Sequence, residues 1–292
     1  MKGIVLAGGR GTRLSPMTLA TSKQLLAVYD KPMIYHPIST LMLAGIREIL
    51  IISTPHDHSQ FVRLLGDGSQ WGITFEYATQ EQPEGIAQSL IIGEDFIAGD
   101  RVSLILGDNI FFGSGLGTSL SKMLERPGAT IFAYEVEDPK DYGVVELDAD
   151  GLPLSIEEKP VLPRSKFAIP GLYSYDSRCV EFSKSLKRSS RGELEISDLH
   201  RIYLESGQLS VEVLDQGQQW FDAGTVENLF QASSFLRSTF IETNQKIGCP
   251  EEAAFRNQWI DSQSLKKIAN SIQNQDYRAY LAGLAEHGLL AP

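Results

Sequence analysis

Apolar segments alternate with helical patterns up to residue 106, and this alternation limits the fold more than any other feature. The segments expected to form strands are Lys2–Ala7, Glu48–Thr54, Thr74–Thr79 and Val102–Leu106, and the helical patterns between them are Pro32–Ala44, Ser59–Leu65 and Gly85–Phe96. Strands and helices that alternate at this spacing form right-handed crossovers and a parallel sheet. Because these strands are nearly free of polar residues, we expect helices on both faces of the sheet. The first half therefore predicts a Rossmann-like, three-layer α/β fold.

The pattern changes after residue 129, where short β-rich pieces follow one another. These pieces are ATIFAYEV, YGVVELD, LPLSIEEK and FAIPGLYSYD, with a further strand pair expected around LSVEVLD. Helices are expected at Val180–Leu186, Ile196–Glu205 and Val226–Thr243, and two or three short ones after Glu251. We predict a mixed, mostly parallel central sheet with an inserted β-rich part. Residues 1–243 are expected to form one domain, with halves of about 1–128 and 129–243, followed by a helical tail over residues 244–292.

The overall charge excludes some classes of partner. A formal net charge of −11 argues against binding to nucleic acid or to an anionic membrane. No apolar run approaches the ~18 residues of a membrane helix. A glycine-rich loop comes too early in the sequence for a signal peptide. Cys179 and Cys249 lie far apart in the sequence, which indicates core residues rather than a disulfide, so we expect a cytoplasmic protein. The stretch from Arg10 to Lys23 includes Arg13 and no acidic residue, so an anionic substrate is expected to bind there.

The glycine-rich loop after the first strand reads VLAGGRGTRLSP, from Val5 to Pro16. Glycines let the backbone approach a ligand, and free N–H groups form a cradle for an anion. Open sheets bind nucleotides at this position, beyond the carboxyl end of a strand. Two phosphate-binding templates do not fit, because G-x-G-x-x-G would need glycine at Leu14 and the P-loop would need lysine at Gly9. The loop instead supplies Arg13, whose planar guanidinium can hold two phosphate oxygens, although a tight turn with solvated arginines is the alternative.

Two aspartates are candidates for a metal site, and a lysine accompanies them. Asp108 in LGDN follows a predicted strand, so its carboxylate is expected to point into the crevice at the strand end. Asp222 in QWFDAGT lies between bulky apolar residues and a glycine, which is a costly place for an unpaired charge. One Mg²⁺ would compensate the charges of both aspartates, because it prefers oxygen ligands. The alternative for Asp108 is an aspartate that caps a turn. Lys23 could reach the same phosphates, although such lysines are also common at surfaces.

Seven motifs in order resemble those of the sugar-1-phosphate nucleotidyltransferases: GGRGTRL, SKQLL, YATQ, LGDN, EEKP, RGELEISD and WFDAGT. The resemblance covers essentially the whole chain and implies the nucleotidyltransferase fold with an inserted sugar-binding part. It implies that dTTP and α-D-glucose 1-phosphate react to give dTDP-glucose and pyrophosphate, by Mg²⁺-assisted attack of the sugar phosphate on the α-phosphorus. It further implies a homotetramer, inhibition by an end-product dTDP-sugar near the tail, and a place in deoxysugar synthesis such as that of dTDP-rhamnose.

The resemblance also assigns roles to residues of this sequence. The nucleotide-binding residues are expected to be Leu6, Gly8, Gly9, Gly11, Thr12, Arg13, Gln24, Gln80, Pro83, Gly85 and Asp108. The sugar-binding residues are expected to be Asn109, Tyr142, Gly143, Glu158, Lys159 and Ile169, with Glu157 facing away from Glu158. The expected catalytic residues are Arg13, Lys23, Asp108 and Lys159, and the expected Mg²⁺ ligands are Asp108 and Asp222. Arg191 is a further candidate for a phosphate contact. Gln80 would read the base, because a carboxamide can accept from N3–H of thymine or uracil and donate to O4.

Two alternatives stay open at this point. The first is a uridylyltransferase or a relative that uses another sugar 1-phosphate, because thymine differs from uracil by one methyl group, which discriminates only ~10–200-fold. Pro170, where the family commonly has threonine, removes a backbone donor beside the expected glucose pocket. The second alternative is a catalytically silent sensor of sugar nucleotides. Intact Arg13, Lys23, Asp108 and Asp222 argue against the sensor.

Overall fold

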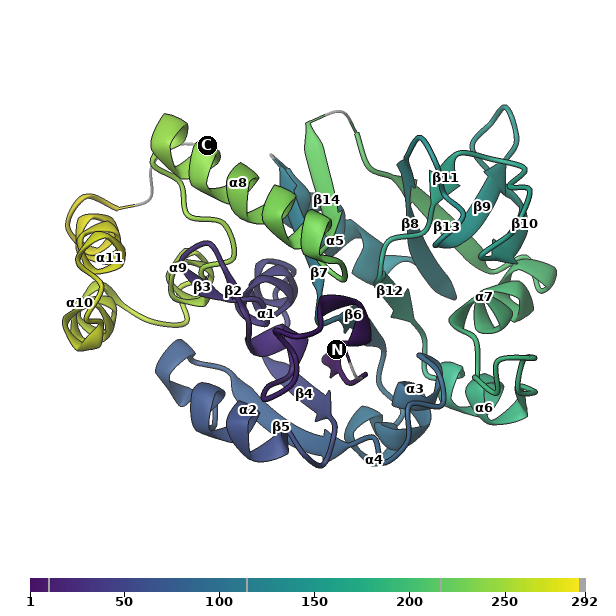
Figure 1. Cartoon of the computed structure of the whole chain (residues 1–292), viewed down its shortest axis with the longest axis horizontal. Coiled ribbons are helices and arrows are strands. Elements are labelled where there is room, and N and C mark those ends of the chain that lie inside the picture. Colours follow the sequence, from purple (N-terminus) through teal and green to yellow (C-terminus); the bar gives the residue numbers. More distant parts are fainter. Residues whose placement is uncertain (10, 114, 216, 289–292) are drawn as a thin grey trace.

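A mixed sheet runs through the centre of the computed structural model (Figure 1), which describes residues 1–288 except Arg10, Ser114 and Gln216. Within these residues the strands are β1 (Lys2–Ala7), β2 (Ala27–Val28), β3 (Lys31–Pro32), β4 (Glu48–Ser53), β5 (Thr74–Thr79), β6 (Val102–Leu106), β7 (Asn109–Gly113), β8 (Ala129–Glu135), β9 (Gly143–Leu147), β10 (Pro153–Glu158), β11 (Phe167–Ala168), β12 (Leu172–Tyr175), β13 (Leu209–Val213) and β14 (Gln218–Asp222). Nine of them follow the order β10-β9-β11-β8-β12-β6-β1-β4-β5, and β13 pairs with β8. Two small two-stranded sheets, β14 with β7 and β2 with β3, lie outside this sheet.

The helices of the described chain cover both faces of the sheet. They are α1 (Tyr35–Leu43), α2 (His58–Leu65), α3 (Gln88–Ile92), α4 (Glu94–Ile97), α5 (Leu116–Glu125), α6 (Cys179–Ser185), α7 (Ile196–Glu205), α8 (Val226–Thr243), α9 (Pro250–Arg256), α10 (Ser262–Ser271) and α11 (Gln275–His287). Short 3-10 turns occupy Thr12–Leu14, Lys23–Leu25 and Ser69–Trp71. None of the helices described here has the length and apolar character to cross a membrane.

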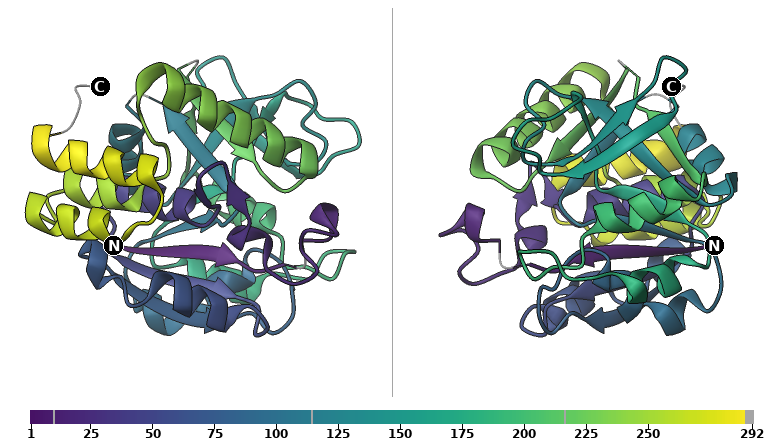
Figure 2. Two further views of the ribbon diagram at one scale, coloured as in Figure 1. Left: turned by 60° about the vertical axis from the view of Figure 1, so that its left-hand side comes forward. Right: turned by 90° about the vertical axis from the view of Figure 1, so that its right-hand side faces the viewer.

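Strand alternation divides the core into two layers. Val5 of β1 lies opposite Ile51 and Ile105, and these three buried side chains share one apolar cluster with α1, α2 and α5. Their neighbours Ile4 and Leu50 belong to the cluster on the other face, with α3, α4, α6 and α7. The two views of Figure 2 show these helices on opposite sides of the sheet. The predicted three-layer α/β fold is therefore confirmed, and both cysteines are free and buried.

Parallel pairing holds the first half together, and antiparallel pairing joins the second half to it. The strands β1, β4, β5 and β6 pair in parallel. Strand β12 runs antiparallel to both β6 and β8, so it joins the β-rich part to the parallel sheet. The sheet is mixed, as predicted.

Two local predictions were wrong, and one strand was not predicted. The expected helix Gly85–Phe96 divides into α3 and α4 at Gly93, where a Cβ atom would lie 2.9 Å from Ile4 Cδ1. The strand that was not predicted is β7 (Asn109–Gly113), which pairs with the distant β14. The expected strand pair around LSVEVLD does not form, since β13 instead pairs in parallel with β8.

Buried charges connect the C-terminal helices to the rest of the molecule. Asp30 accepts hydrogen bonds from the ammonium groups of Lys31 and Lys246, each at 2.5 Å. Both lysine side chains are almost inaccessible to solvent. The Lys246 ammonium lies 3.8 Å from the centre of the Phe240 ring, an arrangement that also stabilises a buried cation. Asp30 therefore links the β2–β3 turn to the segment that leads into α9, α10 and α11, which lie together at one end of the molecule (Figure 1).

Replacing Asp30 by alanine is expected to lower the free energy of unfolding by about 3–5 kcal/mol, because two buried ammonium groups lose their partner. Burial acts to raise the pKa of Asp30, but Lys31 and Lys246 outweigh it and hold that pKa below its ordinary value. A carboxyl whose pKa is lowered by folding stabilises the fold above its unfolded pKa of about 3.9, and this contribution is lost as the pH falls. Urea unfolding at pH 7 and at pH 3 measures both effects.

Asp100→Ala is the matched control for this prediction. Asp100 is half-exposed and lies 3.9 Å from the Lys2 ammonium, so its removal should cost less than about 1 kcal/mol. Equal losses for the two variants at pH 7 would show that the buried charges do not hold the tail in place.

Candidate active site

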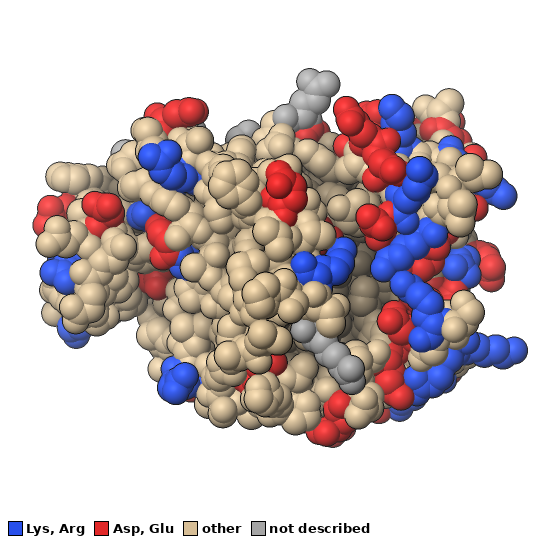
Figure 3. Space-filling view, in the orientation of Figure 1, with Lys and Arg blue, Asp and Glu red and all other residues tan. Residues whose placement is uncertain are grey.

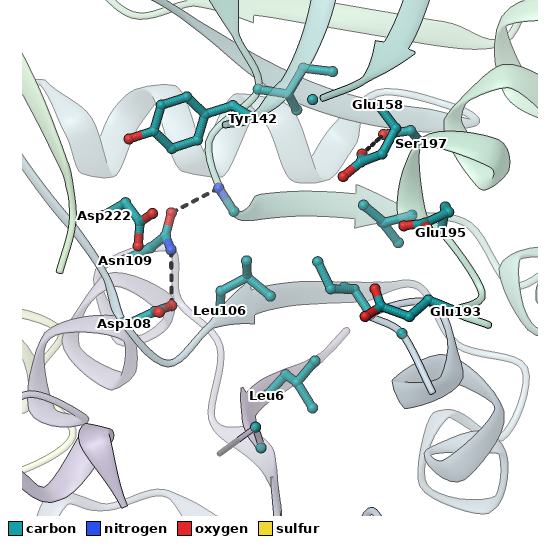
Figure 4. A pocket seen from close by; sticks show the side chains of 18 of the residues that line it. Leu6, Leu106, Asp108, Asn109, Tyr142, Glu158, Glu193, Glu195, Ser197 and Asp222 are labelled. Carbon is teal, nitrogen blue, oxygen red and sulfur yellow. Dashed lines mark hydrogen bonds between the residues drawn. The ribbon is translucent and has the colours of Figure 1, made fainter. Parts of the chain in front are cut away.

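A cavity of about 290 Å³ opens at the carboxyl ends of β1 and β6. Leu6 of β1 and Leu106 of β6, both labelled in Figure 4, line it. The predicted site residues that line it are Leu6, Gly8, Gly9, Arg13, Lys23, Gln24, Gln80, Pro83, Gly85, Asp108, Asn109, Tyr142, Gly143, Glu158, Lys159, Ile169 and Asp222. Gly11 and Thr12 do not line it, although the next residue, Arg13, which also belongs to the 3-10 helix Thr12–Leu14, does. Arg10 lies outside the described residues.

Lys and Arg side chains lie on both sides of the hollow near the middle of the face in Figure 3. The basic residues that line the cavity come from separate segments: Arg13 and Lys23 follow β1, Lys159 follows β10, and Arg191 precedes α7. Six acidic residues line the same cavity: Asp108, Asp141, Glu158, Glu193, Glu195 and Asp222. The four cations therefore do not make the cavity positive overall, and a polyanion bound there would need a further positive charge.

Asp108 and Asp222 are brought together by the pairing of β7 with β14. In this register Asp222 lies opposite Asn109, and the amide N–H of Ala223 donates to the Asp108 carbonyl oxygen at 3.0 Å. Figure 4 shows both carboxylates on the same side of the cavity, on either side of Asn109. Two acidic side chains 114 positions apart in the sequence therefore form one site.

The pKa values of these two aspartates are shifted in opposite directions, and each shift has a clear cause. The Lys23 ammonium pairs with the Asp108 carboxylate. Burial acts to raise the pKa of Asp108, but Lys23 holds it below its ordinary value. Burial, and after it the negative charge of Asp108, raises the pKa of Asp222 to about 6. Lys23 and Arg13 together therefore do not fully compensate the two carboxylates.

The pair of carboxylates fits a divalent cation. Mg²⁺ bound to nucleotides commonly takes one or two protein carboxylates and completes its shell with phosphate oxygens and water. The pKa of Asp222 is raised by burial and, after it, by the negative charge of Asp108, and the nearby Lys23 and Arg13 do not offset these two effects. The donor set therefore suits a divalent cation such as Mg²⁺, which Asp108 and Asp222 would hold.

Arg13 lies directly beside this pair. A Cβ atom on Gly224 would lie 2.7 Å from Arg13 Nη2 and 2.9 Å from Asp222 Oδ1. The guanidinium therefore crosses the backbone of Gly224, two residues after Asp222 in the turn that leads into α8. The turn after β14 thus positions a cation that the loop after β1 supplies.

Gln80 and Gln24 both lie near Gly8. Gln80 is buried, and its side-chain oxygen would lie 2.7 Å from a Cβ atom on Gly8. Gln24 accepts from the Ser22 hydroxyl at 2.5 Å and lies 3.4 Å from the Gly8 carbonyl oxygen. Gly85 has φ +108°, and a Cβ atom there would lie 2.3 Å from the Leu194 carbonyl oxygen, so only glycine fits.

The β-rich part forms the remaining wall. Glu158 of β10 lies opposite Gly143 of β9, accepts from the Ser197 hydroxyl, and lies 3.2 Å from Arg191 Nη2 (Figure 4). Lys159 has φ +44°, a rare value for a side chain with a Cβ atom, and its N–H donates to Tyr142 O. Strained backbone of this kind clusters at functional positions. Glu157 pairs with the exposed Arg164 instead and does not line the cavity.

The sequence analysis missed several lining residues. These are Ile86, Leu106, Asp141, Gly171, Tyr173, Glu193, Glu195, Ile196, Ser197, His200 and Trp220. Trp220 donates to Asn109 Oδ1 at 2.6 Å, and Gly171 N donates to the same oxygen at 2.9 Å. Asn109 Nδ2 donates to Asp108 Oδ1 at 3.2 Å, so this side chain connects β7, β12 and β14 around the aspartate. Only the RGELEISD motif pointed toward Glu193, Glu195 and Ser197.

The fold and the paired aspartates define a nucleotidyltransferase. The chain matches the profile described as Nucleotidyl transferase over residues 2–239, and it belongs to that family. It is 52% identical to the glucose-1-phosphate thymidylyltransferase of Mycobacterium tuberculosis strain H37Rv over 286 residues, which cover 98% of this chain and 99% of that protein. It is 53% identical to the enzyme of the same name from Neisseria meningitidis over 285 residues, with coverage of 97% and 99%.

Solved structures show the same fold. A provisionally assigned glucose-1-phosphate thymidylyltransferase from Bacillus anthracis, crystallised with sucrose, matches with a TM-score of 0.75 and 40% identity over 81% of this chain and 95% of that one. A UDP-glucose pyrophosphorylase complexed with UDP-glucose matches with a TM-score of 0.71 over 82% of this chain and 98% of that one. At 23% identity, the second likeness concerns the fold alone.

Proposed function

We propose that the protein is the enzyme that joins dTTP and α-D-glucose 1-phosphate to give dTDP-glucose and pyrophosphate. The observation that carries this proposal is one cavity lined by Gln80, Arg13, Lys23, the two aspartates and Glu158. The near-full-length relatives that carry the name glucose-1-phosphate thymidylyltransferase support it.

The geometry suits a direct displacement. A phosphate oxygen of the sugar phosphate forms a bond to the α-phosphorus, the bond from that phosphorus to the bridging oxygen breaks, and pyrophosphate leaves with the electron pair. The nucleophile is already an anion, so no side chain needs to take a proton. Ser197 and Cys179 are not arranged as nucleophiles, because the Ser197 hydroxyl donates to Glu158 and burial raises the pKa of the Cys179 thiol to about 12. Catalysis then depends on positioning and on charge neutralisation.

The residues divide this work. Arg13 and Lys23 neutralise the triphosphate, and Lys159 and Arg191 hold the phosphate of the sugar on the opposite wall. The Gly8, Gly9 and Gly85 backbone lets the nucleotide approach closely. Glu158 and Gly143 receive the glucose hydroxyls beside Tyr142, Ile169 and Asn109. A Mg²⁺ held by Asp108 and Asp222 would screen the phosphate charges and orient the attacked phosphorus.

Mixing the protein with dTTP, glucose 1-phosphate and Mg²⁺ is expected to release pyrophosphate and form dTDP-glucose, with dTTP preferred over UTP up to ~200-fold. A coupled pyrophosphate assay, with the product confirmed by mass spectrometry, measures this. A strong preference for UTP would assign the alternative uridylyltransferase. Nucleotide binding without pyrophosphate release would indicate a sensor.

We further propose that the protein acts in the cytoplasm as a homotetramer, feeds deoxysugar synthesis and is inhibited by a dTDP-sugar end product. Two buried free cysteines and nucleotide substrates support a reducing compartment. Light scattering in solution tests the assembly, and inhibition by dTDP-rhamnose tests the regulation.

A further inference from the structure

The Gln80 side chain has both of its amide hydrogens engaged within the protein. Gln80 Nε2 donates to Gln88 Oε1 at 2.6 Å and to the Gly85 carbonyl oxygen at 3.2 Å. Its oxygen, Oε1, lies over Gly8 at the cavity wall. The sequence suggested that Gln80 would both accept from and donate to a base. In the structure only the accepting half is available.

A chain of hydrogen bonds fixes this orientation. Gln88 Nε2 donates to Glu84 Oε2 at 2.8 Å, and the other Glu84 oxygen lies 2.8 Å from Arg188 Nη2. An ionised carboxylate can only accept, so Gln88 must turn its NH₂ group toward Glu84 and its oxygen toward Gln80. Gln80 must then turn its NH₂ group toward Gln88. The negative charge of Glu84, two side chains away, therefore determines which atom Gln80 presents to the cavity.

The backbone holds the relay in place. Leu194 N donates to Glu84 O at 2.7 Å, and Ala87 N donates to Leu194 O at 3.3 Å. Gly85, between these two residues, packs against Leu194 so closely that a side chain would not fit. Gln88 begins helix α3, so its side chain projects from a regular element. The relay is thus attached at both ends, to α3 and to the loop that precedes α7.

We infer that Gln88 and Glu84 are positioning residues that set the base specificity of the site. They hold Gln80 so that only an acceptor oxygen meets the base, which selects a pyrimidine that donates from N3. Thymine and uracil carry N3–H, whereas cytosine has a lone pair there and would face Gln80 Oε1 with a second acceptor. Two facing acceptors leave both atoms without a hydrogen bond, and such a mismatch discriminates by up to ~10⁴–10⁵. This inference rests on the proposed function and deepens it.

Gln88→Leu removes the relay and keeps the size of the side chain. Gln80 then retains only the longer bond to Gly85 and can turn its NH₂ group to the base. The ratio of kcat/KM for dTTP to that for dCTP is expected to fall ~10–100-fold, about 1.4–2.7 kcal/mol of discrimination. The fall should come from KM for the nucleotide, with kcat for dTTP within ~3-fold of the parent, because this contact is equal in the ground and transition states. KM for glucose 1-phosphate should not change.

The double variant Glu84→Gln, Gln88→Glu is the rescue. It moves the carboxylate from position 84 to position 88 and reverses the hydrogen bond between these two positions, but position 88 still accepts from Gln80 Nε2, so the dTTP preference should return to within ~3-fold of the parent. Gln82→Leu is the matched control: it makes the same change on an exposed side chain of the same loop and should leave the ratio as it is. Should Gln88→Leu not fold, Glu84→Gln alone carries the test, because a neutral amide no longer fixes the direction of the relay.

The results separate this inference from the proposed function. A parent protein that releases no pyrophosphate with dTTP refutes the proposed function itself. An active parent whose dTTP to dCTP ratio is unchanged in Gln88→Leu, or in Glu84→Gln where the first variant does not fold, refutes only the relay. A lower ratio that the double variant does not restore shows that the two residues act by packing and also overturns the inference.

Discussion

Replacing Asp108 by asparagine is expected to lower kcat about a thousandfold, while the protein stays folded. Asparagine has the same size and can still accept from Lys23, so the local structure should hold. It lacks the charge that Asp108 contributes with Asp222 to a divalent cation. Pyrophosphate release at saturating substrates measures the loss, and urea unfolding checks the fold. The variant should also need more Mg²⁺ for half-maximal rate.

Asp222→Asn should give a loss of similar size, and the double variant little more, because ligands of one ion act as a unit. Asp95→Asn, on the exposed surface of α4, is the control for the same chemical change. If both site variants kept a rate within fivefold of the parent, about 1 kcal/mol in barrier height, the two aspartates would not be metal ligands.

Arg13→Ala is expected to lower kcat ~10²–10³-fold with only modestly weaker binding of dTTP. The guanidinium faces the aspartate pair, where charge on the leaving pyrophosphate develops, so its effect belongs to the transition state. Arg13→Lys should recover part of the rate, since it restores the charge but not the planar fork. Single-turnover kinetics and dTTP titration separate the two contributions. Arg63→Ala, on an exposed face of α2, should change neither.

Gly224→Ala tests the position of Arg13 without removing its charge. The new methyl group would lie 2.7 Å from Arg13 Nη2, so the guanidinium must move. We expect the loss of kcat to be ~10-fold smaller than that of Arg13→Ala, and the dependence of the rate on Mg²⁺ to stay the same.

For Arg13→Ala itself, a collapse of dTTP affinity with normal kcat would show instead that Arg13 serves binding alone.

Elements with a strong local pattern were predicted from the sequence to within a residue or two. Lys2–Ala7 and Val102–Leu106 are short runs made mostly of apolar residues, and Ile196–Glu205 and Val226–Thr243 repeat apolar residues at helical spacing. Neighbouring residues therefore suffice to specify these elements. Strand β7 was missed because Gly107-Asp108-Asn109 resembles a turn. Its hydrogen bonds come from β14, more than 100 residues away, and no local pattern contains them.

The motifs also identified most of the residues that line the cavity, since glycines, cations and carboxylates at fixed spacings follow from the chemistry of phosphates. Their mutual arrangement did not follow. This arrangement depends on how strands far apart in the sequence meet. Examples are the contact of Arg13 with Gly224, the pairing of Lys23 with Asp108, and the position of Gly11 and Thr12 outside the cavity. The direction of the Gln80 carboxamide is decided by Glu84 through Gln88. By itself the sequence determined which chemical groups are present, because composition and periodicity are local. Only the tertiary structure decided which atoms of those groups face the substrate, because hydrogen-bond direction and charge pairing depend on distances in space.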